Sequence, residues 1–94
     1  MAIVLARFTV QDYDAWRQSF EGNAEARKAA GSNGTHIFFN ADNPNDVTVN
    51  FQWDTAEKAK SFLGGAQAAQ YREAAGVTGN FDFWIVEDGG RTPA

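Results

Sequence analysis

The chain has 94 residues, and its twelve acidic and eight basic side chains give a net charge of −4. This length suits one domain with a modest core, and the dispersed basic residues exclude the phosphate-binding surface of a nucleic-acid-binding protein. The chain has no cysteine, which excludes disulfides and thiolate metal sites.

Residues 3–10 predict a first strand, because they alternate and are rich in branched side chains. The wholly apolar face of this strand consists of Val4, Ala6, Phe8 and Val10. Asp12 is a suitable N-cap for a helix over residues 13–30, which Gly31 would end in a left-handed conformation. Spacings of three and four place one set of side chains on a single face of this helix: Tyr13, Trp16, Phe20, Ala24 and Arg27.

A hairpin is predicted next. Residues 35–40 form its first strand, residues 42–46 carry the Asp, Asn and Pro typical of turns, and residues 47–53 form its second strand. The second strand alternates without interruption, which indicates one apolar and one polar face. The apolar row is Val47, Val49, Phe51 and Trp53, and the polar row is Thr48, Asn50 and Gln52.

A second helical region is expected over residues 56–75, with Asp54 as its N-cap and Glu57 three residues later. Gly64 and Gly65 should interrupt this region, after which Ala66 and Ala69 should turn inward. Gly76 should end it.

The last predicted strand covers residues 81–87, after a short loop over residues 78–80. Residues 89–94 are polar and should form a flexible C-terminal tail. We therefore expect one domain over residues 1–88.

The predicted order is βαββαβ, which is the ferredoxin-like motif of the α+β class. Right-handed crossovers place two helices on one face of a four-stranded antiparallel sheet. The opposite face then carries side chains too aromatic for open solvent and too polar for a dry core, among them His36, Phe38, Asn50 and Trp84. We therefore expect this face to pack against a second copy of the chain.

Three segments resemble the dimeric α/β-barrel superfamily, which includes antibiotic-biosynthesis monooxygenase-like proteins and small polyketide cyclases. These segments are residues 10–16 (VQDYDAW), residues 51–54 (FQWD) and residues 75–77 (AGV). The resemblance covers nearly the whole chain. It implies a homodimer whose two sheets pack face to face as a barrel, with a small cleft between helices and sheet in each subunit.

The resemblance also suggests catalytic residues. The cofactor-independent oxygenases of this superfamily use an Asn and a Trp four residues apart on the third strand. Trp53 matches the Trp, but Val49 occupies the place of the Asn, and Asn50 lies one step away on the opposite face unless a β-bulge reorients it. The alternative interpretation is an interface Asn50 and a core Trp53.

The other catalytic patterns of the superfamily are incomplete here. Haem-degrading relatives need a histidine after this strand, and cyclase relatives need a histidine to pair with a tyrosine such as Tyr71. The chain has one histidine, His36, which could act as a general base or be a surface or interface group. No second histidine or carboxylate cluster accompanies it, so we expect no metal site and no cofactor.

The expected ligand-binding residues frame a cleft between the helices and the sheet: Trp16, Phe20, Arg27, Phe51, Tyr71 and Phe83. The aromatic residues among them could equally be ordinary core. Arg27 could bind an anionic or carbonyl group of a ligand, extend to solvent, or pair with an acidic residue such as Glu73, Asp82 or Glu87.

Two functions remain open at this point. The first is a homodimeric protein that binds a small hydrophobic or aromatic molecule. The second is a cofactor-independent monooxygenase or a cyclase that acts on an aromatic, polyketide-like substrate. No segment reaches the roughly 20 apolar residues needed to span a bilayer, and residues 1–7 lack a signal-peptide pattern. The expected location is the cytoplasm.

Overall fold

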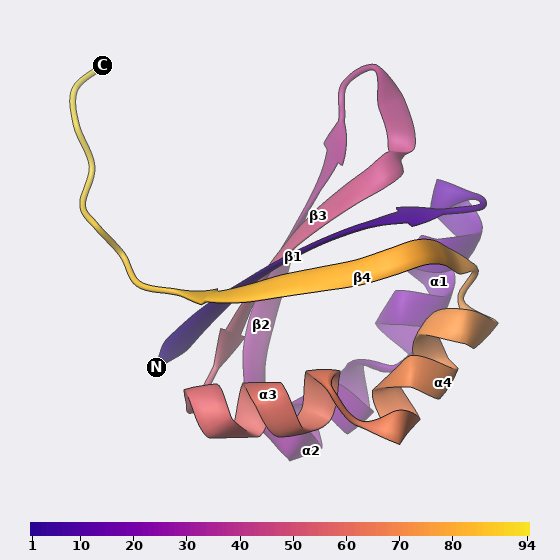
Figure 1. The fold of residues 1–94 in the computed structure, drawn as a ribbon, viewed down its shortest axis with the longest axis horizontal. Coiled ribbons are helices and arrows are strands. Elements are labelled where there is room, and N and C mark those ends of the chain that lie inside the picture. Colours follow the sequence, from indigo (N-terminus) through magenta and orange to yellow (C-terminus); the bar gives the residue numbers. More distant parts are fainter.

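The computed structural model describes residues 1–94 and has the order βααββααβ. The strands and helices are β1 (Ala2–Val10), α1 (Tyr13–Gly22), α2 (Ala24–Ala30), β2 (Ser32–Asn40), β3 (Asn43–Trp53), α3 (Ala56–Leu63), α4 (Ala66–Ala74) and β4 (Val77–Val86). The strands form one antiparallel sheet in the order β2-β3-β1-β4. All four helices lie on one side of this sheet (Figure 1). The predicted ferredoxin-like fold is confirmed.

The first helical region is two helices, where the sequence suggested one over residues 13–30. The break is at Asn23, whose backbone leaves the helical conformation (φ −99°, ψ 11°) and whose N–H donates to the Phe20 carbonyl at 3.2 Å. Gly22 and Asn23 are both weak helix formers, which favours a break here. The break changes the direction of the following turn, so Ala24 is exposed although Trp16 and Arg27 are buried.

Both helical regions begin at a side-chain cap. The Asp12 carboxylate accepts a hydrogen bond from the Ala15 N–H at 3.0 Å, as predicted. The second cap is Thr55, whose hydroxyl accepts from the Lys58 N–H at 3.1 Å, so the prediction of Asp54 was wrong by one residue. The Asp54 carboxylate instead accepts from the Asn33 amide at 2.8 Å, which ties the start of β2 to the end of β3.

The hairpin is tighter than predicted, because its turn is Ala41–Asp42 and Pro44 lies inside β3. Of the residues predicted to form the turn, residues 43–46 instead lie in an irregular part of β3, and the register shifts between Phe39 and Asn40. Asn45 in this irregularity accepts from the Tyr13 N–H at 3.0 Å and donates to the Gln11 carbonyl at 3.3 Å. The hairpin therefore holds the start of α1.

The last strand begins at Val77, earlier than predicted, and the expected loop over residues 78–80 is part of it. A shift in the pairing with β1 between Arg7 and Thr9 accommodates the extra residues of β4. Gly79 has φ 67° within this bulge, a value that glycine adopts without strain. Residues 87–94 have no helix or strand, and the C-terminal segment extends away from the sheet (Figure 1).

The two faces of the sheet differ as the alternation predicted. The face under the helices carries the buried core residues of β1 and β3: Val4, Ala6, Phe8, Val10, Val47, Val49, Phe51 and Trp53. Trp16, Ala59 and Leu63 from the helices complete this core. Phe39 also lies on this side, where it contacts Tyr13 with a centroid separation of 5.1 Å, but it remains 53% exposed beyond the helices.

The opposite face of the sheet is uncovered in the single chain. One row across it, in strand order, is His36, Asn50, Leu5 and Trp84, and the next row is Phe38, Thr48, Arg7 and Asp82. Phe38 is 48% exposed and Trp84 is 54% exposed. This open face, defined by these two rows, is the surface that the sequence assigned to a second copy. No helix is long and apolar enough to cross a membrane.

Candidate functional site

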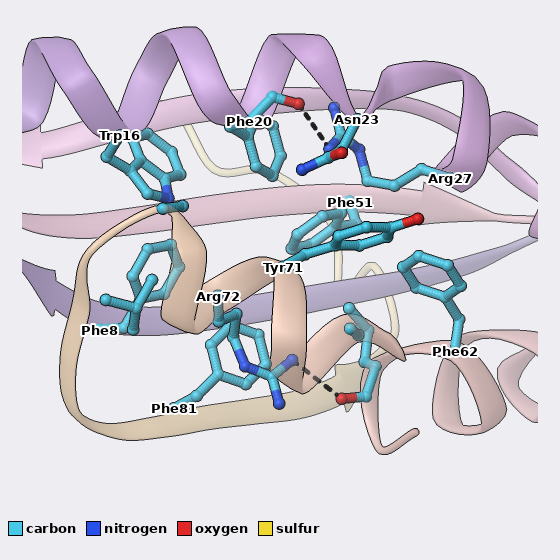
Figure 2. A pocket seen from close by; sticks show the side chains of 14 residues that line it. Phe8, Trp16, Phe20, Asn23, Arg27, Phe51, Phe62, Tyr71, Arg72 and Phe81 are labelled. Atoms are coloured by element: carbon cyan, nitrogen blue, oxygen red, sulfur yellow. Dashed lines mark hydrogen bonds between the residues drawn. The ribbon is translucent and has the colours of Figure 1, made fainter. Parts of the chain in front are cut away.

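A pocket of about 60 Å³ lies between the helices and the face of the sheet that they cover (Figure 2). Its walls come from all four helices and from β1, β3 and β4. Eleven of its fourteen lining residues are hydrophobic. The full set is Phe8, Trp16, Phe20, Asn23, Arg27, Phe51, Phe62, Leu63, Ala68, Tyr71, Arg72, Ala75, Val77 and Phe81.

The two breaks in the helical regions lie beside this pocket. Asn23 separates α1 from α2 and lines the pocket itself, and Gly64–Gly65 separates α3 from α4. Because each region is two short helices, neither can lie flat along the whole sheet. The pocket occupies the space that the four helix segments leave above Phe8, Phe51 and Phe81.

Aromatic contacts define one wall of the pocket. Trp16 and Phe20 stack with ring centroids 4.9 Å apart, and Phe20 meets Phe51 edge-on at 6.0 Å. Phe8 contacts both Trp16 at 5.4 Å and Phe81 at 5.3 Å. Such pairs contribute about 0.5–1.5 kcal/mol each beyond the burial of their area, so this wall is well defined before any ligand arrives.

Arg27 is a buried cation in this apolar surrounding, with 8% of its surface exposed. Its guanidinium lies 3.7 Å above the ring centroid of Phe20 and donates through Nη1 to the Phe20 carbonyl at 2.7 Å. No carboxylate lies within ion-pair distance, so the pairing with an acidic residue considered from the sequence does not occur. Burial lowers the pKa of Arg27 from its ordinary value to about 10, and the side chain remains charged at neutral pH.

Arg72 is a second arginine with similar contacts, half-buried on the opposite side of the pocket (Figure 2). It lies 4.1 Å above the ring centroid of Phe81 and donates through Nη1 to the Leu63 carbonyl at 3.1 Å. It too has no acidic partner, and burial lowers its pKa. Arg72 was not expected from the sequence to line the pocket, although its position four residues after the buried Ala68 places it on the inward face of α4.

The other polar groups of the pocket are Asn23 and the hydroxyl of Tyr71. The Tyr71 oxygen accepts from the Gln67 amide at 2.8 Å, so it is oriented by the preceding turn of α4. No group of three or more His, Asp or Glu side chains is arranged to hold a metal ion.

The structure brings together five of the six ligand-binding residues expected from the sequence: Trp16, Phe20, Arg27, Phe51 and Tyr71. Phe83 lies on the same face of β4 but does not line the pocket. Its neighbour Phe81, at a centroid separation of 5.9 Å, takes that place.

The three expected catalytic residues lie outside the pocket. Trp53 is fully buried in the core, 5.6 Å from Phe62 between ring centroids, and its indole N–H has no hydrogen-bond partner. Asn50 lies on the open face, where its side-chain oxygen is buried without a partner. His36 lies on the edge strand β2, opposite Asn50 of β3, and its ring packs against that of Phe38 with 4.2 Å between the centroids. Asn50 and Trp53 are therefore on opposite faces of the sheet.

Solved structures with the same fold include proteins related to antibiotic biosynthesis. A candidate antibiotic biosynthesis monooxygenase from Bordetella bronchiseptica superposes with a TM-score of 0.78 at 14% identity, covering 93% of this chain and 95% of that one. SnoaB, a cofactor-independent oxygenase from Streptomyces nogalater, superposes with a TM-score of 0.75 at 15% identity, covering 99% of this chain and 97% of that one. A candidate antibiotic biosynthesis monooxygenase from Nitrosomonas europaea superposes with a TM-score of 0.68 at 17% identity, covering 96% of this chain and 100% of that one.

No protein-family model and no curated protein matches the sequence. At these identities the likeness to solved structures establishes the fold, which is that of the antibiotic biosynthesis monooxygenases. The predicted resemblance to this group is confirmed at the level of the fold.

Proposed function

We propose that this protein is a homodimer that binds a small aromatic molecule in the pocket between its helices and its sheet. The main support for this proposal is the composition of the pocket lining, which has eleven hydrophobic residues among fourteen and only a few polar groups. Small-molecule sites generally have this composition. The pocket volume of about 60 Å³ is smaller than the roughly 150 Å³ of a cavity that encloses benzene. A bound ring must therefore lie partly outside the pocket or move the surrounding helices apart, and a bulky ligand is excluded.

Filling the pocket should abolish binding without unfolding the protein. Ala68 is buried in the wall of the pocket, and Ala69 beside it is exposed. In Ala68→Leu the added side chain should occupy the pocket, and NMR titration with 2-naphthamide should show at least a tenfold loss of affinity. Ala69→Leu is the matched control and should bind as the wild type does. Equal binding by both variants would place the ligand elsewhere, and no binding by the wild type would count against the pocket proposal.

The homodimer is supported by the open face, which exposes Phe38 and Trp84 and buries an unpartnered oxygen of Asn50. Exposed aromatic groups around a polar centre are typical of a surface that meets another protein. A second sheet on this face would cover the aromatic rings and offer donors to Asn50.

Adjacent phenylalanines on β2 provide the test of the dimer. Phe38 lies on the open face and Phe39 on the opposite one, with similar exposure of 48% and 53%. Phe38→Glu should shift the protein from dimer to monomer in sedimentation experiments at micromolar concentration, because it places a charge in the interface. Phe39→Glu should remain dimeric. A wild-type monomer of 10.3 kDa under these conditions would overturn the dimer.

A second candidate function is cofactor-independent oxygenation of an aromatic substrate in the same pocket. The likeness to SnoaB over 99% of this chain supports it. The positions of Asn50 and Trp53 outside the pocket count against the pair of residues that the resemblance suggested. Oxygen uptake with an anthrone-type substrate tests this activity directly, and uptake that persists in Asn50→Ala and Trp53→Phe would assign the chemistry to the pocket residues.

A further inference from the structure

Two arginines line a mostly apolar pocket, and the chain supplies no negative charge to either of them. The three ion pairs of the structure are Arg7–Asp46, Arg17–Glu21 and Lys58–Asp54, all at the surface. The chain has twelve acidic residues, so carboxylates are abundant. Arg27 and Arg72 nevertheless face the pocket without one.

The contacts of the two side chains are also alike. Each guanidinium stacks on a phenylalanine ring, at 3.7 Å for Arg27 and 4.1 Å for Arg72, and each donates one hydrogen bond to a backbone carbonyl. A guanidinium has five N–H donors, so most donors of both residues have no protein acceptor. The stack and the single hydrogen bond fix the orientation of the planar group and leave the other donors for a ligand.

The burial of Arg27 beside the half-buried Arg72 points to the same conclusion. A cation in an apolar surrounding is unfavourable unless it is paired. Each arginine belongs to a different helix, α2 or α4, and they lie on opposite sides of one pocket (Figure 2). A negatively charged ligand between them would supply the missing charge.

We propose that the ligand is an aromatic carboxylate, whose ring lies among Trp16, Phe20 and Phe51 and whose carboxylate receives hydrogen bonds from Arg27, Arg72 or both. This inference rests on the proposed function and adds the charge of the ligand to it. A carboxylate is flat and accepts two parallel hydrogen bonds from a guanidinium.

The test compares two probes of the same shape, 2-naphthoate and 2-naphthamide, by NMR titration of the full chain. The wild type should bind 2-naphthoate about tenfold or more tightly than 2-naphthamide, because a charge-assisted hydrogen bond is stronger than a neutral one. Arg27→Met and Arg72→Met should each reduce this ratio to about threefold or less, and Arg27→Lys should retain part of it. Arg17→Met removes a surface arginine paired with Glu21 and should keep the full ratio.

The outcomes separate the inference from the function on which it rests. Equal affinity for both probes, or a preference for 2-naphthoate that survives in both methionine variants, would overturn the carboxylate inference while the aromatic pocket stands. Tighter binding of 2-naphthalenesulfonate than of 2-naphthoate would replace the carboxylate by a tetrahedral anion and also overturn it. Failure of both probes to bind would contradict the proposed function itself.

Discussion

Replacing Trp53 by alanine is expected to lower the free energy of unfolding by about 3–5 kcal/mol, which is the range for removing a large buried aromatic side chain. Trp53 has no exposed surface and packs against Phe62, so alanine would leave a large void beneath α3. Urea denaturation monitored by circular dichroism measures this change. Phe39→Ala, at an exposed ring, should lose less than about 1 kcal/mol.

Trp53→Phe gives the sharper result, because the Trp53 indole N–H is buried without a partner. An unsatisfied buried donor costs about 1–3 kcal/mol, and phenylalanine removes this donor together with part of the ring. We expect a net loss of no more than about 1 kcal/mol and unchanged binding of 2-naphthamide. A loss as large as that of Trp53→Ala would mean that the packing of the indole ring outweighs the cost of its unsatisfied N–H.

Arg27→Met is expected to raise the stability of the ligand-free protein by about 1–2 kcal/mol. Burial lowers the pKa of Arg27 to about 10, which corresponds to a penalty of at most roughly 3 kcal/mol on the charged form, because solvent near the side chain screens part of it. The stack on Phe20 and the hydrogen bond to its carbonyl offset part of this penalty. Methionine fills a similar space without the charge, and equilibrium unfolding at pH 7 measures the gain.

The pH dependence provides the control for this explanation. The pKa of Arg27 is lower in the folded chain than in the unfolded one, so above pH 10 the unfolded state binds more protons and the wild type gains stability as pH rises. The advantage of Arg27→Met should therefore be complete below pH 10 and shrink above it. A variant less stable than the wild type at pH 7 would show that the contacts of Arg27 outweigh its desolvation.

The faces of the sheet could be predicted because alternation has a period of two. Val47, Val49 and Phe51 could not all reach the helices unless Thr48 and Asn50 faced away, and the structure has them so. The bulges were not predictable in the same way. Pro44 and Gly79 look like turn residues in the sequence, and only the pairing with a neighbouring strand shows that they lie within strands.

The pocket was predicted in part, and the missing residues have a common cause. Ala66 and Ala69 were expected to turn inward after an interruption at Gly64–Gly65, but the sequence does not show in which phase the helix resumes after that break. Ala68 and Arg72 face the pocket, and Ala66 and Ala69 are exposed.

The sequence likewise does not show which residues of β4 line the pocket. Periodicity places Phe81 and Phe83 on one face, but the position of the helices above the sheet decides which of them the pocket reaches.

The interrupted helices have a consequence for how a ligand enters. Helix α2 has seven residues and α4 has nine, and segments this short have little stability apart from their packing. They carry Arg27 and Arg72, whereas the opposite wall belongs to the central strands of the sheet. Local opening should therefore concentrate in α2 and α4, so that their amides exchange with solvent faster than those of β1 and β3. We therefore expect a turn of α2 or α4, and not the sheet, to move when the proposed ligand binds.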